Sequence, residues 1–277
     1  MKTLLLSLTL FLGMASQAQY YYIDIIGARE SAEMIKAYRD NKVSRVVVNS
    51  YDANNTRSDD FYVEQTYSPT EQLLKTTTRS NETDASVLLS YTDAAGRVIK
   101  TVDSSANIIS VTTYQYDDNG KLTLIKSNSR DTANKLNETE EHYWQYQNNQ
   151  VYRMLRIKNG IDTTFVELKL DGNGNVVEEQ TRRRGIASEP VYYYYDANNR
   201  LTDIVRFNNK ARRLLPEYMF EYSPANKVIQ KITVPANSSD YLIWRYQYDA
   251  GGLKTKEAVY DKHKTLTGKI EYQYQRG

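Results

Sequence analysis

A stretch of ten residues recurs along the chain and constrains its fold more than any other feature of the sequence. It reads Y-Y-Y-Y-D-A-N-N-R-L at Tyr192–Leu201, and close copies stand at Tyr114–Leu122 and Tyr246–Leu253. Looser copies begin at Tyr91, Leu168 and Phe220. A typical copy has two large residues two positions apart, an Asp, a short run rich in Asn and Gly, and then a basic and an aliphatic residue.

Each copy predicts a β-hairpin. Side chains two positions apart lie on the same face of a strand, so Tyr114 and Tyr116 form a pair of rings on one face. The carboxylate of Asp117 can accept hydrogen bonds from the amides of the turn that it opens. Gly120 tolerates the positive φ that ends such a turn, and Leu122 is then the first buried residue of the returning strand.

The spacing of the copies extends this prediction to most of the chain. The Asp positions of eight units are separated by 25, 24, 30, 24, 25, 27 and 26 residues. A unit of about 25 residues has room for two strands, whereas a four-stranded propeller blade needs roughly 40 to 45. These eight positions are Ser68, Asp93, Asp117, Gln147, Asp171, Asp196, Ser223 and Asp249. The sequence therefore predicts an all-β fold, a repetitive antiparallel hairpin meander over residues 61–277 that forms one long twisted or curled sheet.

Two stretches depart from the repeat. The unit at Trp144–Val151 lacks the Asp and the Gly, and the one interval of 30 residues precedes it. The polar stretch Ser127–Glu141 has no apolar periodicity, so we expect a longer loop there.

The repeat resembles the tyrosine-aspartate (YD) repeats of the Rhs and teneurin type, whose pattern is close to Y-x-Y-D-x-x-G-R-L. Tyr114, Tyr116, Asp117 and Gly120 match it, as do the corresponding residues of the unit around Asp196, where Asn199 takes the Gly position. The resemblance covers roughly residues 60–277. It implies β-hairpins that wind into a spiral sheet, which in the large family members closes into a hollow shell of many more repeats.

The region before the repeats predicts a leader and a cap. Residues 1–18 have a basic start at Lys2, an apolar core and a small-x-small end at Ser16–Ala18, which indicates a signal peptide and a periplasmic or extracellular location. The leader resembles those of exported Bacteroidota proteins. In residues 19–60 we expect a strand at Tyr20–Ile26, an amphipathic helix at Ala28–Asp40 and a strand at Val43–Tyr51, with the helix as an N-terminal cap on the sheet.

Composition excludes several classes of function. Without Lys2, 35 of the 36 basic residues face 34 acidic ones, so the chain lacks the strong net positive charge expected of a protein that binds nucleic acid or an anionic membrane. Arg182–Arg184 and Arg212–Arg213 are interpreted as solvated surface.

The sequence has no Cys, which excludes disulfides and thiolate metal sites. It has 25 Tyr against 5 Phe, so many rings carry a hydroxyl that needs a partner or water.

The sequence offers little for catalysis. His142 and His263 are the two histidines, and both have polar neighbours that suggest loops. The stretch Asp171–Asn175 looks like the start of a calcium loop, but Val176 stands where that motif has Gly and Arg182 where it has Glu. We therefore predict no metal, no cofactor and no enzymatic activity.

Two functions remain as hypotheses. One is an exported binding module that contacts a glycan or an envelope protein through aromatic residues outside the repeat motif, namely Tyr143, Trp144, Tyr152, Tyr241 and Trp244. The other is a carbohydrate-active enzyme with a carboxylate pair among residues such as Asp117–Asp118, Glu138, Glu140–Glu141 and Glu178–Glu179. A transmembrane anchor is not expected, because the apolar run of the leader is shorter than the ~18 residues that a span needs.

Overall fold

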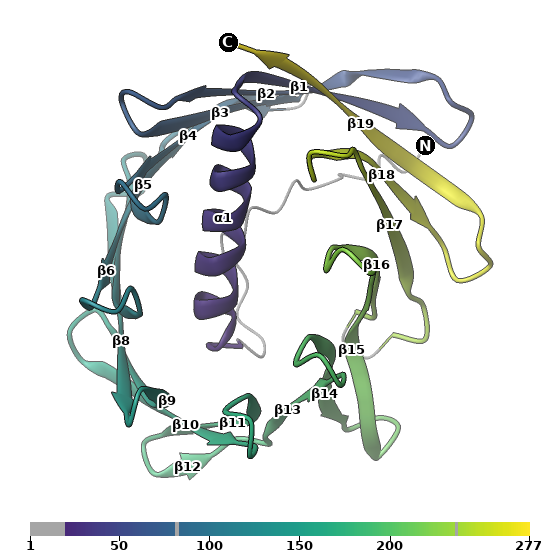
Figure 1. Ribbon diagram of the computed structural model, residues 1–277. Coiled ribbons are helices and arrows are strands. Elements are labelled where there is room, and N and C mark those ends of the chain that lie inside the picture. Colours follow the sequence, from purple (N-terminus) through teal and green to yellow (C-terminus); the bar gives the residue numbers. More distant parts are fainter. Residues whose placement is uncertain (1–19, 81–82, 236–237) are drawn as a thin grey trace.

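The chain forms one antiparallel sheet that closes on itself around a single helix (Figure 1). The computed structural model describes residues 20–80, 83–235 and 238–277, and the predicted signal peptide lies outside them. The sheet has nineteen strands. Their bounds are β1 Val43–Asp52, β2 Arg57–Ser68, β3 Leu73–Ser80, β4 Thr83–Thr92, β5 Val98–Ser105, β6 Ile108–Tyr116, β7 Leu122–Asp131, β8 Leu136–Gln147, β9 Gln150–Lys158, β10 Asp162–Leu170, β11 Val176–Arg183, β12 Ile186–Ala187, β13 Val191–Tyr195, β14 Leu201–Asn208, β15 Arg213–Tyr222, β16 Val228–Thr233, β17 Leu242–Tyr248, β18 Lys254–Tyr260 and β19 Leu266–Arg276.

Closure comes from the first and last strands. Nearly every strand pairs with the next one in sequence. The exception is β12, which pairs with β11 only; β11 also pairs with β13, so the two short strands β12 and β13 share one position in the ring. β1 pairs with β2 on one side and with β19 on the other, in a register that sets Val46 opposite Tyr274. The predicted all-β hairpin meander is thus confirmed, and its curl is complete.

All eight repeat positions lie at chain reversals on the same rim of the sheet. In the turns at Asp93, Asp117, Asp171, Asp196, Ser223 and Asp249, the backbone N–H of that residue donates to the carbonyl four residues on, and the N–H three residues on donates back to it. The residue three positions on has positive φ in each, as at Gly120 (φ 77°) and Asn199 (φ 58°). A register shift just before each of these turns marks a bulge, as between Gln115 and Tyr116. Bulges bend a strand and increase its twist, which helps the sheet to curl.

The repeat tyrosines join neighbouring hairpins. In six units the second Tyr donates its hydroxyl to the carbonyl of the first residue on the return strand of the preceding hairpin, as Tyr222 does to Leu201 at 2.8 Å. The other five bonds are Tyr116 to Val98, Tyr146 to Leu122, Tyr195 to Val176, Tyr248 to Val228 and Tyr274 to Lys254. The basic residue of the motif stacks on the same ring, as Arg200 does 4.8 Å from the centroid of Tyr222.

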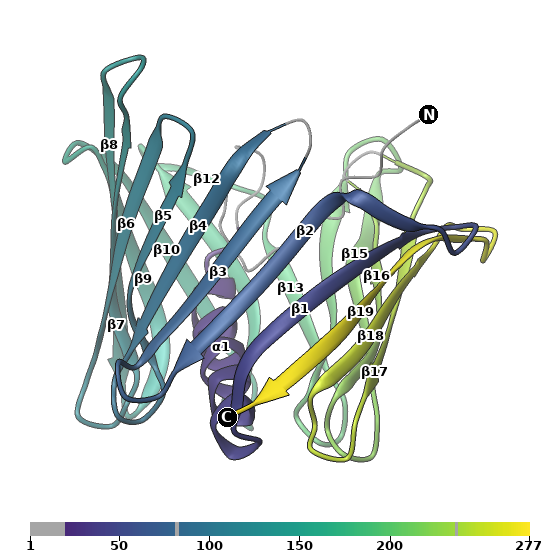
Figure 2. The same ribbon diagram turned by 90° about the horizontal axis from the view of Figure 1, so that it is seen from above.

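The helix α1 (Ile23–Asp40) lies inside the ring (Figures 1 and 2). Its first half packs with Tyr21 and Ile26 against β6–β15, and its second half packs with Ile35 and Tyr38 against β1–β3 and β17–β19. The core of the protein therefore consists of two apolar clusters between the helix and the wall. Asn41 ends the helix and donates from its Nδ2 to Ala37 O at 2.9 Å and to Gly251 O at 3.1 Å, which ties this end to the rim of repeat turns.

Three expectations need correction. Tyr20–Ile26 is not a strand, because the helix begins at Ile23 and Tyr20–Tyr22 pack inside the ring. The helix does not cap an open end, since the closed sheet encloses it. Ser127–Glu141 is largely strand, with β7 running to Asp131 and β8 starting at Leu136. That stretch has no apolar alternation because its inward side chains include the polar Ser127 and Glu140, which lie opposite each other.

Candidate functional site

The five aromatic residues predicted to contact a ligand do not lie together. Trp144 is 3 % exposed and belongs to the first core cluster, so it is not a surface residue. Trp244 packs against the second cluster, and its Nε1 donates to Thr233 Oγ1 at 3.3 Å. Tyr241 is partly exposed near the hairpin between β18 and β19, where its hydroxyl donates to Lys262 O at 3.4 Å.

Tyr143 and Tyr152 share the outer face of β8 and β9. Side chains alternate along a strand, so the inward position of Trp144 places Tyr143 and Gln145 outward. The hydroxyl of Tyr152 donates to the side-chain oxygen of Gln145 at 3.0 Å, and the hydroxyl of Tyr143 donates to Glu141 at 2.7 Å.

A row of outward side chains continues from Tyr143 across three more strands. Tyr143 lies opposite Leu155 on β9, Leu155 lies opposite Phe165 on β10, and Phe165 lies opposite Arg182 on β11. Phe165 is 51 % exposed, between the buried Thr164 and Val166. We call these four side chains the outer row. Sequence reasoning missed Leu155 and Phe165, although the alternation of apolar and polar residues in β10 was a signal that could have found them.

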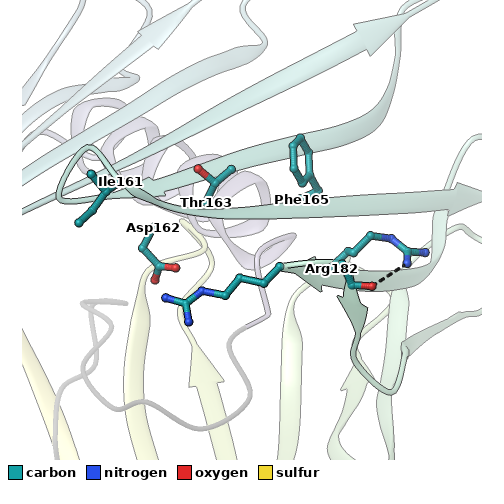
Figure 3. Close-up of a pocket in the computed structure, with 7 residues that line it drawn as sticks. Ile161, Asp162, Thr163, Phe165 and Arg182 are labelled. Carbon is teal, nitrogen blue, oxygen red and sulfur yellow. Dashed lines mark hydrogen bonds between the residues drawn. The ribbon is translucent and has the colours of Figure 1, made fainter.

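An open depression of about 400 Å³ adjoins the outer row (Figure 3). Its apolar lining comes from Ile161 and Phe165, and Arg182 and Arg184 add positive charge. Thr163, Asp162 and Gly185 complete it. Asp162 is engaged, because both of its oxygens accept from Arg183 at 2.8 Å. The depression therefore combines a flat ring, an aliphatic edge and two guanidinium groups without a competing free carboxylate.

Inside the ring, a buried ionic cluster anchors the start of the helix. His142 is 7 % exposed; its Nδ1 lies 2.6 Å from Asp24 of α1, and its Nε2 lies 2.8 Å from Glu140. Arg156 also pairs with Glu140, at 2.6 Å. Burial of the imidazole lowers its pKa, but the charge of Asp24 and the hydrogen bonds to both carboxylates outweigh this effect and raise the pKa of His142 to about 9. Burial raises the pKa of Glu140, but the hydrogen bonds from His142 and Arg156 outweigh this effect and lower that pKa to about 2. His142 is therefore a charged strand residue, whereas the sequence suggested a loop.

Glu179 holds the same end of the helix from β11, three strands along the wall from β8. Its carboxylate accepts from the backbone N–H of Tyr21 at 2.8 Å, from that of Tyr22 at 2.9 Å, and from the hydroxyl of Tyr193 at 2.7 Å. Burial raises the pKa of Glu179, and these three donors oppose that shift. Tyr22, the N-cap of α1, makes no side-chain cap, so Glu179 satisfies amides that would otherwise be buried without partners.

Apart from the exposed Asp118, the acidic residues considered for catalysis have structural partners, and so does Asp171 of the stretch that looks like a calcium loop. Asp117 and Asp171 cap their turns through the amides two and four residues on, at 2.8–2.9 Å. Glu140 and Glu179 anchor the helix, as described above. Glu141, Glu138 and Glu178 form ion pairs with Lys126, Lys158 and Lys169. Within residues 20–80, 83–235 and 238–277, no group of three or more His, Cys, Asp or Glu side chains is placed to hold a metal ion.

Within the part of the chain that the structure describes, no helix combines the length and the apolar character of a membrane-spanning segment.

No known protein family and no curated protein matches the sequence. Among solved structures, the chain is similar to the Tc holotoxin pore of Photorhabdus luminescens, with a TM-score of 0.34 and 15 % identity over 78 % of this chain. It spans only 12 % of the length of that toxin chain. It is also similar to a porin-like protein from Bacteroides uniformis ATCC 8492, with a TM-score of 0.35 and 10 % identity over 84 % of this chain and 98 % of the other. A porin-like protein from Bacteroides vulgatus ATCC 8482 gives a TM-score of 0.31 and 13 % identity over 84 % of this chain and 98 % of the other.

Proposed function

We propose that this chain is an exported, non-enzymatic β-repeat protein of the cell envelope that binds an acidic glycan on the outer face of β8–β11. Export is inferred from the leader sequence at residues 1–18, and the repeat character from the eight chain reversals on one rim, six of which have equivalent turns. The observation that carries the binding proposal is the position of Phe165 between Leu155 and Arg182, at the edge of the depression lined by Arg184.

The chemistry of this surface suits a sugar acid. A flat aromatic ring offers apolar area at a low entropic cost and fits the C–H face of a pyranose. A guanidinium group matches the geometry of a carboxylate with two parallel hydrogen bonds. Phe165 would supply the stacking platform, and Arg182 and Arg184 would bind the carboxylates. Thr163 adds a hydroxyl that can donate to or accept from a sugar hydroxyl.

The state of the carboxylates near this surface supports the proposed non-enzymatic role. Asp162 is held by Arg183 and Glu141 by Lys126. Glycoside hydrolysis needs two carboxyl groups that face each other across the substrate, one of them with a raised pKa. Hydrogen bonds from Arg183 and Lys126 lower the pKa of Asp162 and of Glu141, which is the opposite of what a general acid requires.

Isothermal titration with an oligogalacturonate, a chain of uronic acids, tests this proposal, with a neutral cello-oligosaccharide of equal length as the comparison. We expect binding of the acidic chain alone. Phe165→Ala should weaken it at least tenfold and Arg182→Gln about fivefold, the latter with a smaller dependence on salt. Tyr194→Ala is the matched control, because Tyr194 is an aromatic side chain on β13 with 49 % exposure, away from the depression.

Two results would contradict the proposal: no heat with the acidic chain, or equal losses in Phe165→Ala and Tyr194→Ala. The appearance of new reducing ends during the titration would instead indicate the alternative function, a carbohydrate-active enzyme.

A further inference from the structure

The rim opposite the repeat turns carries an exposed aliphatic residue on five successive hairpins. Each lies at the start of the strand that follows the turn, as its first or second residue or as the residue directly before it. They are Ile108 as the first residue of β6, Leu136 as the first of β8, Ile161 directly before β10, Ile186 as the first of β12 and Leu214 as the second of β15. Their exposure ranges from 36 % at Ile108 to 86 % at Ile161. Single exposed aliphatic residues are ordinary, but a series at equivalent positions marks a contact surface. We call this part of the molecule the aliphatic rim.

Basic residues precede several of these aliphatic residues, and their backbone has the left-handed conformation that is unfavourable for a residue with a long side chain. Lys135, Arg184 and Arg212 have φ of 53°, 50° and 51°, one or two residues before an exposed aliphatic residue. Left-handed backbone is strained for residues other than Gly and, to a lesser degree, Asn. The turns of the opposite rim use Gly or Asn at most of their left-handed positions. Three of the five hairpins of the aliphatic rim therefore have a less stable turn than Gly or Asn would give, and each presents a long cationic side chain instead.

The charge of the aliphatic rim is one-sided. Residues 131–138, 158–162, 183–187 and 208–214 contain seven basic and three acidic side chains. All three acids are engaged: Asp131 by the amides of its turn, Glu138 by Lys158, and Asp162 by Arg183. Among the residues that the structure describes, no carboxylate forms an ion pair with the other five cations, which are Lys135, Arg184, Lys210, Arg212 and Arg213. The near-neutral balance of the whole chain hides this local excess.

The hairpins share one end of the closed sheet, so their tips can meet a single extended surface together. Figure 2 shows the hairpins β5–β6 and β7–β8 projecting at that end, away from the end at which α1 leads into β1. A partner that binds this rim must accept several separate aliphatic side chains and five unpaired cations at once. Such a partner has anionic groups at its surface and an apolar layer behind them. A bilayer with anionic headgroups has this structure.

We infer that the aliphatic rim is a docking surface for an anionic lipid bilayer. The tips at Leu136, Ile186 and Leu214 enter the boundary between headgroups and acyl chains, and Arg184, Lys210 and Arg212 bind lipid phosphates. The protein then stands with its closed sheet upright on the membrane and its repeat turns away from it. A second copy of this chain is a poorer occupant, because the same five cations would face each other across a two-fold contact.

Flotation of the purified protein with vesicles tests the inference. One set contains phosphatidylglycerol in phosphatidylcholine and the other phosphatidylcholine alone. We expect binding to the anionic set only, weakened by salt. Ile186→Ser with Leu214→Ser should reduce the bound fraction at least tenfold, and Lys210→Gln with Arg212→Gln by a similar factor, since each cation near an anionic surface contributes about fivefold. All these side chains are exposed, so the variants should keep the far-ultraviolet circular dichroism of the parent.

The matched control is Ile99→Ser with Ile229→Ser. These two side chains are 39 % and 38 % exposed and lie beside the repeat turns, on the opposite rim. Binding should be unchanged in this variant, and also in Phe165→Ala, because Phe165 belongs to the glycan surface alone, whereas Ile161 and Arg184 lie in both surfaces. The inference is overturned if anionic vesicles do not bind, if phosphatidylcholine alone binds equally well, or if the control variant loses as much binding. It is also overturned if Ile186→Ser with Leu214→Ser abolishes a dimer in solution without affecting vesicles, because the occupant would then be a second copy.

Discussion

At the scale of single residues, the structure gives a reason for tyrosine in the repeat motif. The ring of the second Tyr lies on the inner face, where Phe would pack equally well. Its hydroxyl donates to a carbonyl of the preceding hairpin in six units, and in four of them the basic residue of that hairpin stacks on the ring. The motif therefore specifies contacts between neighbouring hairpins as well as the hairpin itself.

Replacing one such hydroxyl tests this reading. Tyr222→Phe removes the 2.8 Å bond to Leu201 O and leaves a buried carbonyl with one partner fewer. We expect a loss of about 1 kcal/mol in the free energy of unfolding, measured by denaturant titration. Tyr194→Phe, at an exposed ring of the same motif, should change it by less than about 0.5 kcal/mol. Equal effects in the two variants would mean that the bonds between hairpins do not stabilise the fold.

At the scale of elements, the helix is fixed to the wall by ionic contacts at its first turn and by apolar contacts along its length. The pKa of His142 is raised from its usual value of 6.5 to about 9. A cation with a raised pKa stabilises the folded state fully below the unfolded pKa, and this contribution is lost as the pH rises through the folded pKa. Glu140, with a pKa lowered to about 2, acts in the opposite sense, since its contribution is lost as the pH falls from about 4.5 towards 2.

The anchor of the helix should therefore weaken between pH 6.5 and pH 9. We expect the stability of the parent protein to fall over this range by at most about 3 kcal/mol more than that of His142→Gln, whose side chain does not titrate. Thermal unfolding from pH 6 to pH 10 measures this difference. Parallel pH profiles for the two proteins would show that folding does not raise the pKa of His142.

The hairpins could be predicted from the sequence, whereas the place of the helix could not. The turn at Asp117 depends on residues within five positions of each other, so local chemistry determines it. The surroundings of the helix depend on His142 and Glu179, more than 100 residues away, and on a curl that makes them converge. The outer row was missed for a similar reason, because Tyr143, Leu155, Phe165 and Arg182 become neighbours only through the register of four strands.

At the scale of the whole molecule, closure turns a linear repeat into one cooperative unit. An open array of repeats unfolds in segments, since each repeat contacts only its neighbours. In this chain β1 and β19 are paired, and the two halves of the wall share the helix. Unfolding of one half of the wall should therefore remove the helix and strand contacts that stabilise the other half.

The two tryptophans can report on this coupling, because Trp144 lies in the first core cluster and Trp244 packs against the second. The variants Trp244→Phe and Trp144→Phe each keep one tryptophan, whose fluorescence reports on one cluster. The fluorescence of each should change at the same denaturant concentration as its circular dichroism. Ile270 on β19 has 1 % exposure, and adding Ile270→Ser should reduce the free energy of unfolding by about 3 kcal/mol. Both midpoints should then fall together. Separate transitions, or a shift confined to Trp244, would show that the halves unfold independently.

The enclosed helix also constrains how the molecule is assembled. The wall is completed only when its first and last strands meet, and by then α1 must already occupy the interior, because a finished ring would have to open to admit it. The last strand thus seals in the element that precedes the first strand, and contacts of such long sequence separation make for slow folding. The chain therefore passes through a stage in which its two terminal edges are unpaired and available to other polypeptides, so the final pairing step is when it is most vulnerable to misassembly.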